Sequence, residues 1–270
     1  MPNKNKNKSV IAIINQKGGV GKTTTVINLA TSLSILGRKN LIIDLDPQGN
    51  ATTGLGKSNN EEENNIYNLL INKINLSEAI KKTEIDNLDL ISSNVNLSGI
   101  EVETANDSDR AFTLKNVLEK NRHDLLNKYD NIFIDCPPSL SLLTIMALVA
   151  SEELLVPLQT EFFALEGITQ LIKTIDRIKI NLNPKLSVQG ILLTMFDKRN
   201  KLSSEVDIEA RKFFNNKVYR TVIPRNVRLS EAPSHGMPVL IYDKSCTGSK
   251  SYFSFTEEFL KQDEIMESAA

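Results

Sequence analysis

The feature that most constrains the fold is a glycine-rich segment, residues 16–24, between an apolar run and a helical pattern. Residues 10–15 are apolar and rich in β-branched side chains, which is typical of a buried strand. After the glycines, apolar residues recur at helical spacing until Gly37 ends the pattern. This order predicts a phosphate-binding loop, because glycines let backbone N–H groups turn toward phosphate oxygens and the helix N-terminus adds its dipole.

The residues of this loop that are expected to contact a nucleotide follow one another in the chain. Lys22 is expected to bridge the β- and γ-phosphates, and the Thr23 hydroxyl is expected to bind Mg²⁺. The ordinary spacing asks for glycine at position 16, where this chain has Gln16, and it offers Lys17 instead. The full set of expected contacts is Lys17, Gly18, Gly19, Val20, Gly21, Lys22, Thr23 and Thr24.

Further apolar runs predict a parallel sheet. Strands are expected at residues 10–15, 41–43, 88–91, 132–134, 154–156, 191–194 and 218–223. Helical patterns lie between most of them, for example at residues 165–178 and 206–214. This alternation favours an α/β fold with a doubly wound, mostly parallel sheet and helices on both faces.

The chain shows no strong shift in composition that would divide it into two domains. We therefore expect a single P-loop ATPase domain over residues 9–262. A basic tail at residues 1–8 precedes it, and a C-terminal tail at residues 263–270 follows it. The polar stretches at residues 57–65 and 104–109 are expected to be surface loops.

Carboxylates follow two of the predicted strands. Asp44 and Asp46 stand two residues apart, so in an extended chain both side chains project to the same side. Asp135 ends an apolar strand and is followed by Cys136 and two prolines, which is typical of a Walker B segment that holds a metal-bound water. Because ligands of doubly wound folds bind at the carboxyl ends of the strands, we expect these carboxylates beside the nucleotide.

Composition limits the possible partners. The formal net charge is −1, so binding to nucleic acid or to an anionic membrane needs a local basic patch. The two cysteines, Cys136 and Cys246, have neither metal-ligand nor redox spacing, which favours the cytoplasm. The N-terminal segment lacks the apolar stretch of a signal peptide, and no apolar run approaches the length of a membrane span.

The nucleotide base is expected to be adenine. Guanine specificity in many GTPases rests on an Asn-Lys-x-Asp segment after a late strand. Residues 194–197 occupy that place, and their sequence Thr-Met-Phe-Asp contains no lysine. The sequence therefore favours ATP, with Mg²⁺ as its cofactor.

Nearly the whole chain resembles the ParA/MinD superfamily. The glycine loop resembles its deviant Walker A motif, and residues 157–167, 221–236 and 238–242 closely resemble chromosomal ParA proteins of the Soj type. The resemblance implies that Lys17 reaches across a nucleotide-sandwich dimer to the phosphates of the second copy. It also implies that Asp46 orients the attacking water and that Asp44 acts through the Mg²⁺ shell.

The resemblance also implies a base site and a DNA-binding surface. The loop containing Pro224 and Arg225 should lie near the adenine. Arg199 and Arg228, each within a cluster of cations, match arginines that bind DNA without sequence preference. Guanidinium groups suit phosphate oxygens, so this binding should depend strongly on salt.

The implied function is that of a chromosome or plasmid partitioning ATPase. ATP binding would close a homodimer on nonspecific double-stranded DNA, and hydrolysis, stimulated by a ParB-type centromere-binding protein, would release the DNA. Such a protein would be cytoplasmic and associated with the nucleoid.

Two other functions of the same superfamily stay open. A MinD-like regulator of division that cycles on a membrane would need a basic amphipathic helix at the C-terminus. Residues 252–264 have acidic neighbours, which favours packing of Phe255 and Phe259 on the core and no stable membrane association. An iron–sulfur reductase would need bridging cysteines, and neither Cys136 nor Cys246 has a Cys-x-x-Cys companion.

Overall fold

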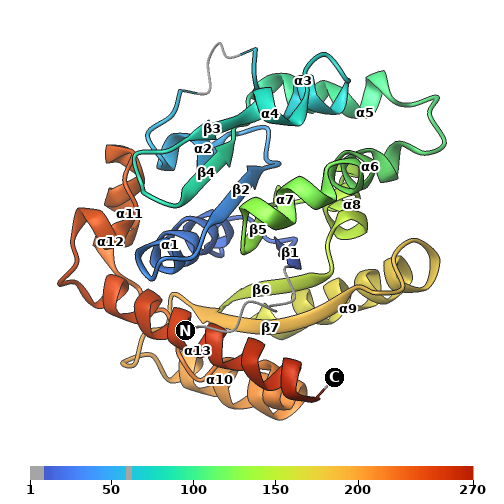
Figure 1. Cartoon of the computed structure of the whole chain (residues 1–270). Coiled ribbons are helices and arrows are strands. Elements are labelled where there is room, and N and C mark those ends of the chain that lie inside the picture. Colours follow the sequence, from blue (N-terminus) through green and yellow to red (C-terminus); the bar gives the residue numbers. More distant parts are fainter. Residues whose placement is uncertain (1–8, 59–62, 270) are drawn as a thin grey trace.

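A computed structural model describes residues 9–58 and 63–269, and these form a layered α/β structure (Figure 1). The predicted basic tail at residues 1–8, residues 59–62 of the predicted polar loop and Ala270 lie outside the described residues. The domain boundaries at residues 8 and 262 stay a prediction.

Seven strands of the described residues form one sheet in the order β3-β4-β2-β5-β1-β6-β7. Their bounds are β1 Ser9–Ile13, β2 Asn40–Asp44, β3 Ile80–Lys82, β4 Leu88–Ile91, β5 Asn131–Asp135, β6 Glu153–Gln159 and β7 Ser187–Thr194. Every neighbouring pair is parallel except β3 and β4, which are antiparallel. The predicted doubly wound, mostly parallel sheet is confirmed.

Helices connect most of the strands. The longer ones are α1 Lys22–Ile35, α6 Thr113–Lys120, α7 Arg122–Lys128, α8 Leu142–Ala150, α9 Ala164–Asn181, α10 Lys201–Phe214 and α13 Thr247–Ala269. The shorter ones are α2 Asn50–Gly54, α3 Ile66–Leu70, α4 Leu76–Ala79, α5 Ile100–Glu103, α11 Val227–Glu231 and α12 Val239–Tyr242. None of the helices in the described part of the chain has the length and apolar character that a membrane span requires.

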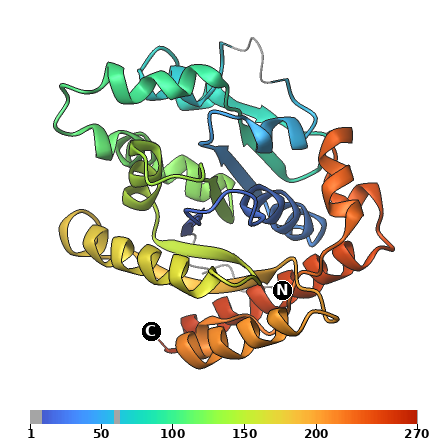
Figure 2. The same cartoon turned by 180° about the vertical axis from the view of Figure 1, so that it is seen from behind.

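Alternate residues of the central strands enter two separate cores, one on each face of the sheet. From β1, Val10 and Ala12 join the core that includes α6, α8 and α9, whereas Ile11 and Ile13 join the core that includes α1 and α13. Figures 1 and 2 show the two helix layers from opposite sides. Because both faces are covered, the central strands are apolar throughout, which is why they were easy to predict.

Helix α13 packs on the core through its aromatic side chains. Tyr252, Phe255 and Phe259 are each 1% exposed or less, and Phe255 and Phe259 contact each other with ring centroids 6.2 Å apart. The predicted packing of Phe255 and Phe259 on the core is confirmed. These rings are therefore not available to a lipid surface.

The strand predicted at residues 218–223 is wrong, and hydrogen bonding explains why. The segment meets β7 only by an isolated bridge between Ile191 and Val218 and by backbone bonds from Tyr219 and Ile223. The backbone N–H groups of Arg220 and Thr221 donate to the Glu258 carboxylate of α13, at 2.6 and 2.8 Å, and not to a strand. The carboxylate thus replaces the neighbouring strand that a ladder would need.

Candidate active site

The strand order brings three chain segments together at one edge of the sheet. Strands β2, β5 and β1 are consecutive in the sheet, so Asp44, Asp135 and the glycine loop after β1 all lie at adjacent carboxyl ends. Asp44 and Asp135 are direct partners in the β2–β5 register. This is the edge at which doubly wound folds bind their ligands.

The glycine loop is held in place by polar contacts at both ends. At its start, the Asn15 amide donates to the Pro157 carbonyl at 2.8 Å and its oxygen accepts from the Lys17 N–H at 3.0 Å. Farther along, the Thr194 hydroxyl donates to the Val20 carbonyl at 2.8 Å. Gly21, the residue before α1, has φ +92°, a left-handed conformation that favours glycine.

Lys22 lies inside this loop, at the first position of α1. Its side chain is almost buried, and its ammonium donates to the Lys17 carbonyl at 3.0 Å. Burial lowers the pKa of Lys22, and the nearby carboxylates of Asp135 and Asp46 partly offset this effect. A buried cation at the start of a helix with no acidic residue in its first turn suits a phosphate group.

Two carboxylates are completely buried beside the loop. Asp44 accepts hydrogen bonds from the Thr52 N–H and hydroxyl, at 2.8 and 2.7 Å, and from the Asp46 N–H at 3.2 Å. Burial still raises the pKa of Asp44 to about 6. Burial and then the charge of Asp44 raise the pKa of Asp135 well above its ordinary range. Both shifts indicate that a positive charge would be favourable here.

The donor set fits Mg²⁺. The Thr23 hydroxyl donates to Asp135 Oδ2 at 2.7 Å, and Asp135 Oδ1 is buried without a hydrogen-bond partner. Within the described residues, no three His, Cys, Asp or Glu side chains form a metal site by themselves. Mg²⁺ keeps several waters and takes ligands from nucleotide phosphates. Thr23 would bind the ion, and Asp44 and Asp135 would hold its waters.

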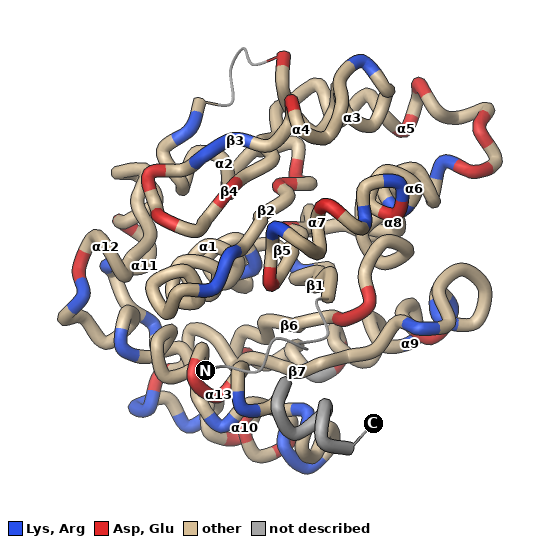
Figure 3. Tube along the Cα trace, viewed as in Figure 1, with Lys and Arg blue, Asp and Glu red and all other residues tan. Residues whose placement is uncertain are grey.

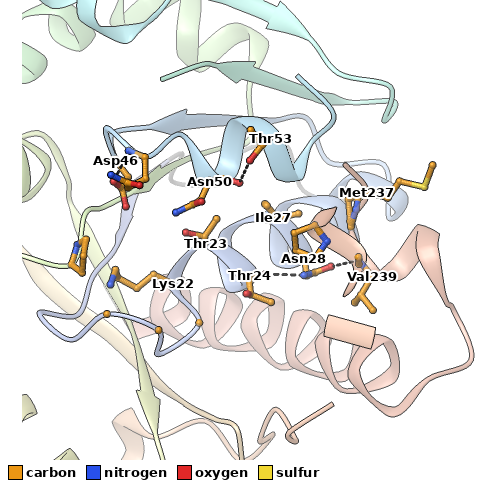
Figure 4. A pocket seen from close by; sticks show the side chains of 18 of the residues that line it. Lys22, Thr23, Thr24, Ile27, Asn28, Asp46, Asn50, Thr53, Met237 and Val239 are labelled. Carbon is orange, nitrogen blue, oxygen red and sulfur yellow. Dashed lines mark hydrogen bonds between the residues drawn. The ribbon is translucent and has the colours of Figure 1, made fainter. Parts of the chain in front are cut away.

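A cavity of about 380 Å³ opens over the loop, which is within the usual size of small-molecule sites. Figure 4 shows Lys22, Thr23 and Asp46 at one end of it and Asn28, Met237 and Val239 at the other. Asp46 Oδ1 accepts from the Gln48 N–H at 3.0 Å. The charged end and the apolar end match the triphosphate and the base of a nucleotide.

Sequence reasoning missed the apolar end of this cavity. The residues that it did not identify are Ile27, Asn28, Gln48, Asn50, Thr53, Pro138, Met195, Ala232, Pro233, Met237, Pro238 and Val239. The side chain of Asn28 joins two of the contributing segments, since it donates to the Thr24 carbonyl at 2.8 Å and accepts from the Val239 N–H at 2.9 Å. The signals in the sequence were the helical spacing that places Thr24 and Asn28 on one face of α1 and the resemblance of residues 221–236 and 238–242 to the family, which assigned them no contact with the nucleotide.

Pro224 and Arg225 line a neighbouring cavity of about 340 Å³. Gly21, Thr24, Met195 and Pro233 line this cavity as well as the first one, so the two are contiguous. Met195 has φ +50°, which is unusual for a residue other than glycine. The contact of Pro224 and Arg225 with adenine stays a prediction.

Lys17 does not line the cavity of its own chain. Its side chain is 52% exposed, and its ammonium forms an ion pair with Glu161, which follows β6. The structure therefore separates the two lysines of the loop. The side chain of Lys22 lies in the cavity, and the side chain of Lys17 lies outside it.

The two predicted DNA-binding arginines are exposed and each contacts carboxylates of its own chain. Arg199 forms a two-pronged contact with Asp197, at 3.1 Å for both hydrogen bonds. Arg228 donates to Glu231 at 2.7 Å and lies 3.5 Å from Asp243. Neither arginine lines the two cavities described above.

Comparisons with known proteins identify the family of this chain. The family described as AAA domain matches residues 8–188. The chromosome partitioning protein ParA of Caulobacter vibrioides is 48% identical over 254 residues, which are 94% of each chain. The chromosome-partitioning ATPase Soj of Treponema pallidum is 44% identical over 253 residues, which are 94% of this chain and 97% of the relative.

A solved structure shares the fold and carries ligands. Cobyrinic acid a,c-diamide synthase from Mycobacterium smegmatis, with bound ATP analog and magnesium, has a TM-score of 0.83 and 32% identity, with 94% of both chains covered. The fold and the cavity therefore define a P-loop ATPase that uses ATP and Mg²⁺ and has a second lysine in its phosphate loop. Within this class, the chain belongs to the ParA/Soj family of chromosome-partitioning ATPases.

Proposed function

We propose that this chain partitions DNA by an ATP-gated cycle of dimer formation. ATP binding closes two copies around their nucleotides, the dimer binds double-stranded DNA without sequence preference, and hydrolysis opens the dimer and releases the DNA. The observation that carries the proposal is the placement of the two lysines. Lys22 serves the phosphates of its own chain, whereas Lys17 is exposed outside the cavity, where it can reach the nucleotide of a second copy.

In the catalytic step, each group near the phosphates has a separate role. Lys22 binds the β- and γ-phosphates, and Lys17 of the second copy adds a cation that offsets the charge developing during phosphoryl transfer. Mg²⁺, when bound, neutralises phosphate oxygens. Asp46 lies at the same end of the cavity and orients the attacking water.

The variant Asp46→Ala tests this role. It should bind ATP and retain less than about 1% of turnover, since one positioned group typically contributes about 10²–10⁴-fold. Turnover near the wild-type rate would exclude the role.

DNA binding is assigned to Arg199 and Arg228. In the view of Figure 3, Lys and Arg are interspersed with Asp and Glu along the described residues, which favours DNA binding through a small local patch. Two copies in one dimer double the number of arginines presented to the duplex. The partner that stimulates hydrolysis is a ParB-type centromere-binding protein, and the DNA-bound dimer resides on the nucleoid. The similarity to chromosome-partitioning relatives over 94% of the chain supports both assignments.

DNA binding under three nucleotide conditions tests the proposal. A labelled duplex is titrated with the chain without nucleotide, with ADP, and with a non-hydrolysable ATP analogue and Mg²⁺, each at low and high salt. Tight binding is expected only with the analogue, and it should weaken as salt rises. Lys17→Ala should bind the analogue and yet fail to dimerise or to bind DNA. Equal DNA binding in all three nucleotide states would contradict the proposal.

A further inference from the structure

Three loops form a continuous rim beside the nucleotide cavity. Strands β5, β1 and β6 are consecutive in the sheet, so the loops that follow them lie side by side. Contacts confirm this arrangement: a side chain at Gly18 would meet Pro138 at 3.7 Å, and Lys17 forms its ion pair with Glu161. The loop after β5, the glycine loop and the loop after β6 therefore present a single surface.

The part of this rim after β6 is unusually apolar. Phe162 and Phe163 are 73% and 67% exposed, and their rings contact each other edge to face with centroids 5.0 Å apart. Leu140, in the loop after β5, is also exposed, at 41%. Single exposed apolar side chains are ordinary, but two phenylalanines that contact each other, on the same rim as an exposed leucine, form an apolar patch of the kind that interaction surfaces use.

The charges of the rim favour a second copy of this chain as the occupant. Lys17 and Glu161 contribute one positive and one negative charge next to the phenylalanines. DNA or an acidic partner would be repelled by Glu161 without a surplus of cations to offset it. A two-fold interface, in contrast, places the same patch against itself, so apolar, positive and negative parts of one copy can each meet a suitable part of the other.

We propose that Phe162 and Phe163 are the apolar anchor of the interface between two copies, next to Lys17 and Glu161. The inference rests on the proposed function, because Lys17 reaches a second nucleotide only if the rims of two copies meet. Aromatic side chains in the middle of an interface usually carry much of the binding energy. The edge-to-face contact orders the two rings before docking, which reduces the conformational entropy lost on association.

Serine substitutions test the anchor. Phe162→Ser and Phe163→Ser are compared with the wild-type chain by sedimentation in the presence of a non-hydrolysable ATP analogue and Mg²⁺. Each variant should weaken dimerisation by at least about 30-fold, the effect of an interface residue worth about 2 kcal/mol. The affinity of the single chain for a fluorescent ATP analogue should stay within about threefold of wild type, which a general folding defect would not allow.

Phe213→Ser is the matched control. Phe213 lies on α10, is 64% exposed and forms a similar pair with Phe214, with ring centroids 4.7 Å apart. This control should dimerise as the wild-type chain does; if it weakens as much as Phe163→Ser, exposed apolar surface in general is responsible and the inference is wrong. Leu140→Ser provides an independent variant on the opposite side of the rim, and it should weaken the dimer as well.

The outcomes separate this inference from the proposed function. If the wild-type chain stays monomeric with the analogue, both the proposed function and this inference are wrong. If the wild-type chain dimerises, Lys17→Ala does not, and the phenylalanine and Leu140 variants dimerise normally, the proposed function stands and the anchor is refuted.

Discussion

Asp44 illustrates how a functional residue can oppose the stability of its own fold. It is completely buried and accepts three hydrogen bonds, yet burial raises its pKa to about 6 from an ordinary 3.8. The neighbouring charge of Asp46 adds to the shift. Such a group favours the fold when protonated, so its ionised form at neutral pH is retained at a cost in stability.

This shift predicts a pH dependence of the stability of the nucleotide-free chain. The folded state binds the Asp44 proton more tightly than the unfolded state, so the contribution of Asp44 to stability falls as pH rises from about 4 to about 6 and is constant above that window. Asp44→Asn removes the contribution of Asp44 and leaves that of Asp135, whose pKa is also raised by burial. Denaturation with urea between pH 4.5 and 7.5 should show the variant gaining about 2 kcal/mol relative to wild type, on top of any constant offset.

Asp197→Asn is the control for this measurement. Hydrogen bonds from Arg199 lower the pKa of Asp197, so its contribution has the opposite sign and is present above its ordinary pKa. Its variant should gain no stability over wild type as pH rises. If Asp44→Asn also shows no gain through the window, burial does not dominate the titration of Asp44.

At the scale of residues, the sequence predicts the positions of site residues that follow from the order of the strands. It does not predict the positions that follow from packing between distant segments. Asp44, Asp46 and Asp135 were placed at one edge because parallel strands align their carboxyl ends. The apolar end of the cavity was not foreseen, since Met237 and Val239 reach it from a segment about 200 residues away from the glycine loop. The Lys17–Glu161 pair was missed for the same reason.

At the scale of elements, the sequence predicts the central strands, which are apolar because both of their faces are buried. It does not correctly predict two segments at the edges of the sheet. Strand β3 has three residues, Ile80–Lys82, two of them lysines, so it lacks any apolar pattern and was not predicted. Residues 218–223 are apolar enough for a strand, but their hydrogen bonds go partly to Glu258. Local sequence cannot report which partner a backbone N–H group finds.

Strand β7 and the segment after α10 meet at a glycine, which allows a test of this packing. A side chain at Gly190 would lie 2.3 Å from the Tyr219 ring, which is itself packed edge to face on Phe255 at 4.8 Å. Gly190→Ala should therefore lower the free energy of unfolding by about 1–3 kcal/mol through overpacking. Calorimetry should show a fall in Tm of about 2–4 °C per kcal/mol for a chain of this length.

Gly167→Ala is the matched control, because nothing lies within 4 Å of its added methyl group and it stands inside α9. It should be neutral or stabilising by up to about 1 kcal/mol. The variant Tyr219→Ala removes the ring, and in this background Gly190→Ala should lose most of its effect. Independent, additive effects of the two substitutions would show that the ring is not what excludes a side chain.

At the scale of the whole molecule, the charge distribution separates assembly from DNA binding. A chain with a formal net charge of −1 has little general attraction for DNA, so affinity depends on a few cations presented in the right place. Arg199 and Arg228 are exposed, and both contact carboxylates in the single chain. Their phosphate contacts must therefore compete with Asp197 and Glu231, which makes the contribution of each arginine small and the number of copies decisive.

The salt dependence of DNA affinity measures that number. If two arginines from each of two copies contact phosphates, the double variant Arg199→Ala, Arg228→Ala should lose about four contacts, and the slope of log affinity against log salt should fall by roughly 3–4. Arg122→Ala with Arg177→Ala changes the net charge equally but alters arginines on α7 and α9, so it should leave the slope within about one unit of wild type. Anisotropy of a labelled duplex, titrated at four salt concentrations with the ATP analogue, gives both slopes. If the slope falls by only about 2 in the double variant of Arg199 and Arg228, one copy alone contacts the duplex. If the double variant of Arg122 and Arg177 gives the same slope, net charge governs the binding and these two arginines do not.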